Sequence, residues 1–276
     1  MIVRTGYTAK DVAKLLDLPP HRVRSFIQAG LVDANRGSRG EYRISFQSLV
    51  LLRAAKDLAS ARVPQRRIKK ALKQLRDDLP ADGSLSGLQI AAEADRVVVH
   101  DGTKRWNPES GQLHFNFDVA DLARRAAPIA RRQAQEARGA QDLSADDWYE
   151  MACDLEAPAP DEARRAYRRA LDLDPDHADA HVNLGRIHHE MGELAPAEYH
   201  YRAALQTDPD DATATFNLGV VLEDRNRAAD ALAAYEKVLR ADPAHADAHY
   251  NAAGLCKRLG RHAEALRHLK SYKELC

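Results

Sequence analysis

A fixed step of 34 residues organises the C-terminal half of the chain. Proline follows aspartate three times at this spacing, and small, aromatic and amide residues recur at the same step. The recurring positions are Pro175, Pro209 and Pro243; Ala163, Ala197, Ala231 and Ala265; Tyr167, Tyr201 and Tyr235; and Asn183, Asn217 and Asn251. Several independent positions that recur in phase, without an insertion, indicate a stack of similar supersecondary units rather than one globular core.

Each unit has the residue types of two packed helices. Alanine suits a helix crossing because a larger side chain would hold the helices apart, and proline ends the second helix and begins the turn. The segments LGRIHHEMGELAPAEYHYRAALQTDPDD and LGVVLEDRNRAADALAAYEKVLRADPAH resemble the tetratricopeptide repeat. The resemblance covers residues 144–276 and implies an α-solenoid of about four repeats. We expect these repeats at 144–177, 178–211, 212–245 and 246–276.

Such a solenoid has a concave face lined by the first helix of each repeat, which predicts a groove for a protein or peptide partner. The expected groove residues are Val182, Asn183, Arg186, Phe216, Asn217, Val220, Tyr250 and Asn251. The asparagine series has two interpretations, because an amide both donates and accepts hydrogen bonds. It either forms a ladder along an extended peptide or pairs with the neighbouring repeat.

The net charge of zero conceals a strong asymmetry along the chain. Residues 1–79 carry 17 Lys and Arg against 7 Asp and Glu, whereas residues 144–276 carry 16 against 25. A basic N-terminal part followed by an acidic C-terminal part predicts nucleic acid as the partner of the first and a different partner for the second.

The basic N-terminal part, residues 1–79, has the pattern of a helix-turn-helix followed by a hairpin. Two short amphipathic segments, residues 9–16 and 20–28, flank the turn Asp17-Leu18-Pro19-Pro20. A glycine-rich basic hairpin, DANRGSRGEYRISF, comes next and precedes two longer helical segments. The run YTAKDVAKLLDLPPHRVRSFIQAGLV, with the later GEYRIS, resembles the winged helix-turn-helix domain of the MerR family. We place this domain at residues 1–79, with the resemblance itself over about 6–79.

The resemblance implies that the second helix enters the DNA major groove and that the wing grips the backbone beside it. Ser25, Phe26 and Ile27 depart from the family pattern, so a sequence preference cannot be carried over. Basic side chains on both elements fit contacts with bases or phosphates of double-stranded DNA. The expected DNA-binding residues are Lys10, His21, Arg22, Arg24, Arg36, Arg39, Tyr42 and Arg43. The run QRRIKK has two interpretations, a solvated helix face or a second backbone contact.

The middle of the chain changes its period. Residues 85–117 alternate with a two-residue period and contain the turn signal Asp101-Gly102, which predicts a small antiparallel β-meander. Residues 118–143 form a connecting helix, broken or kinked at Pro128. MerR relatives dimerise through a helix at this point, so a homodimer and a helix that only packs against the first repeat are both open.

Patterns that support catalysis or cofactor binding are missing from the sequence. It has no phosphate-binding loop, dinucleotide fingerprint or nucleophile elbow, so we expect neither an enzyme nor a cofactor. The histidines at 177, 181, 188, 189 and 200 lack metal-ligand spacing and are interpreted as surface residues. No stretch reaches the roughly 20 apolar residues of a membrane span. The chain is expected in the bacterial cytoplasm, at the nucleoid when bound to DNA.

Together these patterns predict a mainly α chain with a winged helix-turn-helix, a small central β-meander and a C-terminal repeat solenoid. The favoured function is a MerR-like transcription regulator whose repeats bind a protein. The alternatives are an adaptor whose winged helix does not bind DNA, and a small-molecule sensor centred on the sheet.

Overall fold

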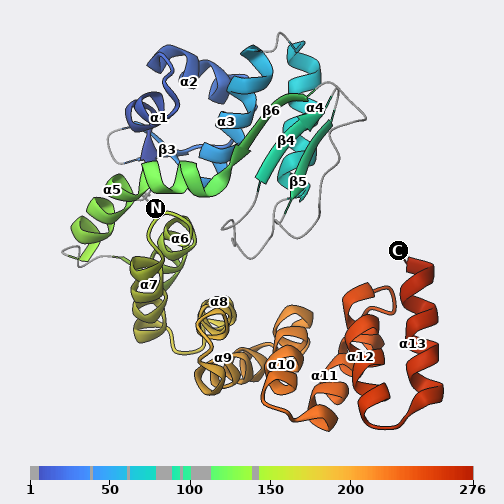
Figure 1. The fold of residues 1–276 in the computed structure, drawn as a ribbon. Helices are drawn as coiled ribbons and strands as arrows, with labels where there is room; N and C mark the ends of the chain where they lie inside the picture. Colours follow the sequence, from blue (N-terminus) through green and yellow to red (C-terminus); the bar gives the residue numbers. More distant parts are fainter. Residues whose placement is uncertain are drawn as a thin grey trace. The chain divides into compact units, whose positions relative to one another are not determined.

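The computed structural model divides the chain into two compact units, Met1–Ala166 and Tyr167–Cys276 (Figure 1). The residues that it describes are 6–37, 40–60, 63–78, 89–93, 96–100, 113–138 and 143–275. The expected turn at Asp101-Gly102 lies outside these residues.

The N-terminal unit begins with the expected winged helix-turn-helix. Its helices are α1 (Ala9–Leu16), α2 (Pro20–Gln28), α3 (Phe46–Ser60) and α4 (Gln65–Asp78). Its three short strands are β1 (Tyr7–Thr8), β2 (Asn35–Arg36) and β3 (Tyr42–Ile44), antiparallel in the order β1-β3-β2. The apolar faces of these elements form one core, whose fully buried members include Leu16, Ile44, Phe46, Leu49 and Leu52.

Local chemistry sets the ends of the first two helices. The Asp11 N–H donates to Thr8 Oγ1 at 3.2 Å, and the Thr8 N–H donates to the Asp11 carboxylate at 3.0 Å, so each residue caps the other at the start of α1. Asp17 ends the helix with a left-handed φ of 51°, and Pro20 occupies the first position of α2, where its fixed φ suits a helix. The tight turn between the helices therefore follows from the sequence.

A second antiparallel sheet consists of β4 (Gln89–Glu93), β5 (Arg96–His100) and β6 (Leu113–Asp118). The antiparallel sheet is confirmed, but its order, β5-β4-β6, is not that of a meander, because β6 pairs with β4. Strand β4 is therefore the central strand, with β5 and β6 on its two sides. Ile90 on the central strand is fully buried and joins the core of the winged helix.

Helix α5 (Val119–Arg138) follows β6 directly and is assigned as one helix with Pro128 inside it, so the expected break is not found. Its buried stripe consists of Val119, Leu122, Ala123, Ala126, Ala127, Ala130 and Ala134. The first part of this stripe belongs to the same core as the winged helix, and α5 packs on α1. The side chains that a dimerisation helix would offer to a partner are therefore largely used within the chain.

Paired antiparallel helices make up the C-terminal part of the chain (Figure 1). They are α6 (Ala145–Leu155), α7 (Pro160–Leu173), α8 (Ala178–Glu190), α9 (Leu194–Thr207), α10 (Ala212–Asp224), α11 (Ala228–Ala241), α12 (Ala246–Arg258) and α13 (His262–Leu275). The predicted repeat solenoid is confirmed, with Pro175, Pro209 and Pro243 just beyond the second helices.

In each of the two central helix pairs, a glycine of the first helix packs against a tyrosine ring of the second. A Cβ atom on Gly185 would lie 2.9 Å from the ring of Tyr201, and one on Gly219 would lie 2.7 Å from the ring of Tyr235. Both rings are essentially inaccessible, at 1% and 0% exposure. The first helix therefore needs glycine because the aromatic ring of the second occupies the space of a side chain.

Gly219→Ala should accordingly destabilise the repeats by about 1–3 kcal/mol, because the buried ring of Tyr235 cannot move aside without repacking. Urea unfolding followed by far-ultraviolet circular dichroism measures this change. Gly254→Ala is the matched control, since nothing lies within 4 Å of a Cβ at that position on α12. It should be neutral or stabilising by up to about 1 kcal/mol. Equal effects of the two substitutions would contradict the explanation.

Candidate functional site

Helix α2 presents a basic exposed face. Val23 and Phe26 are buried on its inner side, whereas His21, Arg22 and Arg24 are exposed. The Arg22 guanidinium lies 6.0 Å from the centroid of the Phe26 ring, and Arg24 forms no ion pair with any residue that the structure describes. This is the arrangement that a recognition helix requires, because unpaired basic groups are available to bases or phosphates.

The wing holds one arginine in a defined position. Arg36 on β2 is exposed, and its guanidinium lies 3.9 Å from the centroid of the Tyr42 ring on β3. Its Nη1 also donates to the Gly40 carbonyl at 2.7 Å. Stacking of this kind is worth about 0.5–1 kcal/mol at an exposed site and leaves the positive charge facing solvent. Of the other expected wing residues, Arg39 lies outside the described part of the chain.

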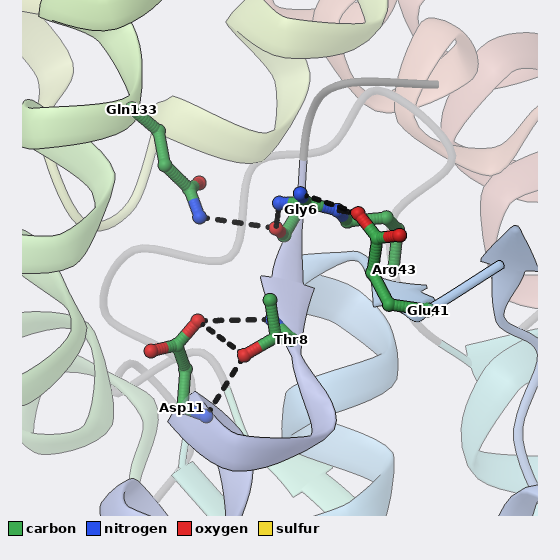
Figure 2. Close-up of polar contacts among 6 residues, drawn as sticks. All are labelled: Gly6, Thr8, Asp11, Glu41, Arg43 and Gln133. Atoms are coloured by element: carbon green, nitrogen blue, oxygen red, sulfur yellow. Dashed lines mark hydrogen bonds and ion pairs between the residues drawn. The ribbon is translucent and has the colours of Figure 1, made fainter. Parts of the chain in front are cut away.

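Arg43 is placed differently from Arg36. Its Nη2 lies 2.7 Å from Glu41 Oε1, and its Nη1 donates to the Gly6 carbonyl at 3.3 Å (Figure 2). Its side chain is only 21% exposed. Successive residues of a strand point to opposite faces, so Tyr42 and Arg43 diverge. The structure thus brings Arg36 and Tyr42 together and uses Arg43 to join the wing to β1. The alternation Glu41-Tyr42-Arg43-Ile44, with a carboxylate two residues before the arginine, was the signal for this in the sequence.

The other candidates on this unit are accessible. Lys10 is exposed in the first turn of α1, and Arg66, Arg67, Lys69 and Lys70 are exposed on α4. Both interpretations of the QRRIKK run therefore remain open.

The expected groove residues of the repeats divide into buried and accessible groups. Val182 and Asn183 are buried, at 6% and 3% exposure, whereas Tyr250 is 58% exposed. Phe216, Asn217, Val220, Arg186 and Asn251 are half-buried. Phe216 packs on the ring of His245, with a centroid separation of 4.9 Å, and Tyr250 lies 5.3 Å from Tyr272. Arg186 is paired with Glu190 at 2.8 Å.

Two asparagines of the series bind the preceding repeat. Asn183 Nδ2 donates to the Tyr167 hydroxyl at 2.9 Å, and Asn251 Nδ2 donates to the Tyr235 hydroxyl at 3.3 Å. These bonds favour pairing with the neighbouring repeat over a ladder along a peptide, because one amide N–H of each residue already binds a tyrosine of that repeat.

The histidines are less exposed than the sequence suggested. His181 and His188 are both 6% exposed, and both lie against His200. Nδ1 of His181 lies 2.9 Å from Nδ1 of His200, and burial with the two neighbouring histidines lowers the pKa of His200 to about 4. The interpretation as surface residues was wrong for His181 and His188, since side chains on two packed helices meet there. Within the described residues no group of three or more His, Cys, Asp or Glu is placed to hold a metal ion.

A cavity of about 420 Å³ lies within the N-terminal unit, and the sequence did not indicate it. Its walls come from β1, the end of the wing, α5 and α6, including Tyr7, Asp11, Arg43, Gln133 and Asp154. Gln133 on α5 donates to the Gly6 carbonyl at 3.0 Å, which ties the helix to β1 (Figure 2). Residues far apart in the chain form this cavity, so no local sequence motif predicts it.

Asp154 on α6 is the unusual group of this cavity. Its Oδ1 accepts a hydrogen bond from the Phe46 N–H at 2.9 Å. Burial, with a further contribution from the charge of Glu150, raises the pKa of this carboxyl to about 7. Tyr7 is 1% exposed, and its hydroxyl has no hydrogen-bond partner among the described residues. Burial, together with the charges of Asp154 and Asp11, raises the Tyr7 pKa.

Comparisons with known proteins identify both parts of the chain. Residues 7–75 match the model of the MerR HTH family regulatory protein, and residues 155–212, 190–243 and 216–276 match that of the tetratricopeptide repeat. The chain joins a MerR-type helix-turn-helix to tetratricopeptide repeats. Each family model covers less than half of the chain.

Solved structures resemble the repeats. A crystal structure of MamA is 20% identical, with a TM-score of 0.50, and the match covers 58% of this chain and 95% of that one. A second MamA crystal structure is 19% identical, with a TM-score of 0.49, over 56% of this chain and 91% of that one. At 20% identity the first likeness shows the fold alone. A comparison with curated proteins found no match. Among the helices that the structure describes, none has the length and apolarity to cross a membrane.

The raised pKa of Asp154 predicts how stability depends on pH. Unfolding returns this pKa from about 7 to the ordinary value of 3.8, so the folded state holds an extra proton between these two values. The free energy of unfolding should therefore fall as pH rises from about 4 to 7. Asp154→Asn keeps an oxygen for the Phe46 N–H and removes the charge. It should abolish this fall and stabilise the protein at pH 8 by about 2–4 kcal/mol.

Urea unfolding at pH 5 and pH 8 tests this prediction, with Asp161→Asn as the control. The Asp161 side chain is 83% exposed, so its replacement should leave the pH dependence unchanged. A steep pH dependence that persists in Asp154→Asn would contradict the assignment.

Proposed function

We propose that the MerR-type domain binds double-stranded DNA and that the tetratricopeptide repeats bind a protein or peptide, so that the chain acts as a transcription regulator. The observation that carries the proposal is the pair of exposed basic features on this domain, the outer face of α2 and Arg36 stacked on Tyr42 in the wing. The two family matches support the assignment of a regulatory domain to one end and an interaction domain to the other.

The two parts of the DNA-binding surface have different roles. On α2, Arg24 is exposed and forms no ion pair with a described residue, so its guanidinium is suited to two parallel hydrogen bonds with a guanine edge. On the wing, Arg36 is held by stacking on Tyr42, which suits a phosphate contact of fixed position. Lys10, His21 and Arg22 are exposed and add positive charge or donors, and Arg39 is a further candidate from the sequence.

The repeats offer accessible aromatic surface to a partner. Tyr250 is 58% exposed on α12, and Phe216 and Val220 are half-buried on α10. Aromatic side chains supply large contact area to an interface. The described helix α5 does not support dimerisation through its apolar stripe, because that stripe is buried in the same chain. A homodimer would therefore need another surface.

Arg24→Ala should weaken binding to a selected duplex by about 1–3 kcal/mol and relax the preference at one base pair. The duplex is obtained by selection from a randomised DNA pool with the wild-type chain, and fluorescence anisotropy measures the affinity. Arg267→Ala, which removes an arginine with 77% side-chain exposure from α13, is the control and should leave affinity unchanged. If the pool yields no motif and no duplex binds in a salt-dependent manner, the regulator is excluded and the adaptor is favoured.

The salt dependence of DNA affinity should distinguish the roles of Arg36 and Arg43. With about four to six phosphate contacts, the slope of log affinity against log salt should be about −4 to −5. Arg36→Ala should weaken binding to all sequences alike and reduce the magnitude of the slope by about one. Arg43→Ala should change the slope less, because Glu41 already neutralises its guanidinium, and should instead lower the thermal midpoint. Equal changes of slope would show that Arg43 leaves Glu41 to bind DNA.

A further inference from the structure

We propose that the cavity between β1, the wing, α5 and α6 is a binding site for a small organic cation, an alkyl chain that carries a primary ammonium group. The site lies at the end of the wing and includes side chains of α6, the first helix of the expected repeats. Its volume, about 420 Å³, is within the range of about 300–1,000 Å³ that small-molecule sites occupy.

The charges of the cavity wall favour a cation. Two carboxylates are already neutralised, since Glu41 pairs with Arg43 at 2.7 Å and Glu136 lies 3.6 Å from Arg132. Asp11 and Asp154 also line the cavity, and neither forms an ion pair with a described residue. The remaining charge of the wall is therefore negative whenever Asp154 is ionised.

A buried group without a partner gives an independent reason to expect a ligand. Tyr7 lines the cavity, is 1% exposed and leaves its hydroxyl without a hydrogen bond to any described residue. A buried hydroxyl of this kind is unfavourable unless something binds to it. An ammonium group has three N–H donors, so it can donate both to the Tyr7 hydroxyl oxygen and to the Asp154 carboxylate.

The rest of the lining suits an alkyl chain. Ala134, Met151 and Leu155 line the same cavity and are buried at 4% exposure each. Methionine adapts to ligands of different shape because its side chain is unbranched and flexible. The combination of an apolar wall with a few polar groups is typical of sites for small organic molecules.

Calorimetric titration of the full chain with n-butylamine and 1,4-diaminobutane tests the proposal, and butane-1,4-diol and succinate serve as uncharged and anionic controls. The amines should bind and the controls should not. Asp154→Asn should weaken amine binding by about tenfold or more, because a charge-assisted hydrogen bond is lost. Asp161→Asn on α7 is the matched control and should bind as the wild type does.

A second variant keeps the test informative if Asp154→Asn does not fold. Tyr7→Phe removes only a hydroxyl that has no partner, so its thermal midpoint should not fall. Its affinity for the amines should nevertheless fall by about three- to tenfold. At pH 6, where the carboxyl of Asp154 is mostly protonated, amine binding should also release a proton, which titrations in buffers of different ionisation enthalpy detect.

Three results would overturn the proposal. They are the lack of binding by either amine at millimolar concentration, binding of succinate or the diol as tight as that of the amines, and unchanged amine affinity in folded Asp154→Asn or Tyr7→Phe. The titrations contain no DNA, so their outcome is independent of the proposed DNA-binding function.

Discussion

The burial of the α5 stripe is the interaction on which the N-terminal unit depends. Helix α5 begins where β6 ends, and Val119, Leu122 and Ala126 enter the same core as the winged helix. Gln133, further along α5, then binds the Gly6 carbonyl of the segment that leads into β1. Alanine at most stripe positions lets the helix approach closely, because a short side chain adds little separation. The cavity lies beside this contact, with α5 as one of its walls.

The sequence left open a homodimer through the connecting helix and a helix that only packs against the first repeat. In the structure, the first part of the apolar stripe of α5 is buried in the core of the winged helix. Helix α5 packs on α1 of the winged helix. Within the N-terminal unit, Asp154 of α6 accepts a hydrogen bond from the backbone N–H of Phe46, the first residue of α3. The first helix after the connecting segment is thus part of the structural support of the winged helix.

In the repeats, aromatic residues set the spacing of the helices. Tyr201 and Tyr235 each occupy the space above a glycine of the preceding helix. Tyr235 also accepts a hydrogen bond from Asn251 of the next repeat. One residue type therefore joins the two helices of a repeat and links that repeat to its neighbour. This double role explains why tyrosine, asparagine and glycine recur together at the same step.

The sequence by itself determined the features that rest on local chemistry or on repetition. The prolines of the turns, the glycine-rich basic hairpin and the 34-residue step identified both folds, and the exposed arginines of α2 follow from helical periodicity. Only the tertiary structure decided the order β5-β4-β6, the burial of His181 and His188, the bond of Arg43 to the Gly6 carbonyl, and the cavity at Asp154. Most of these features join segments distant in the chain. Their energies depend on burial and on charges that meet only after folding, and no pattern within one segment records which segments will meet.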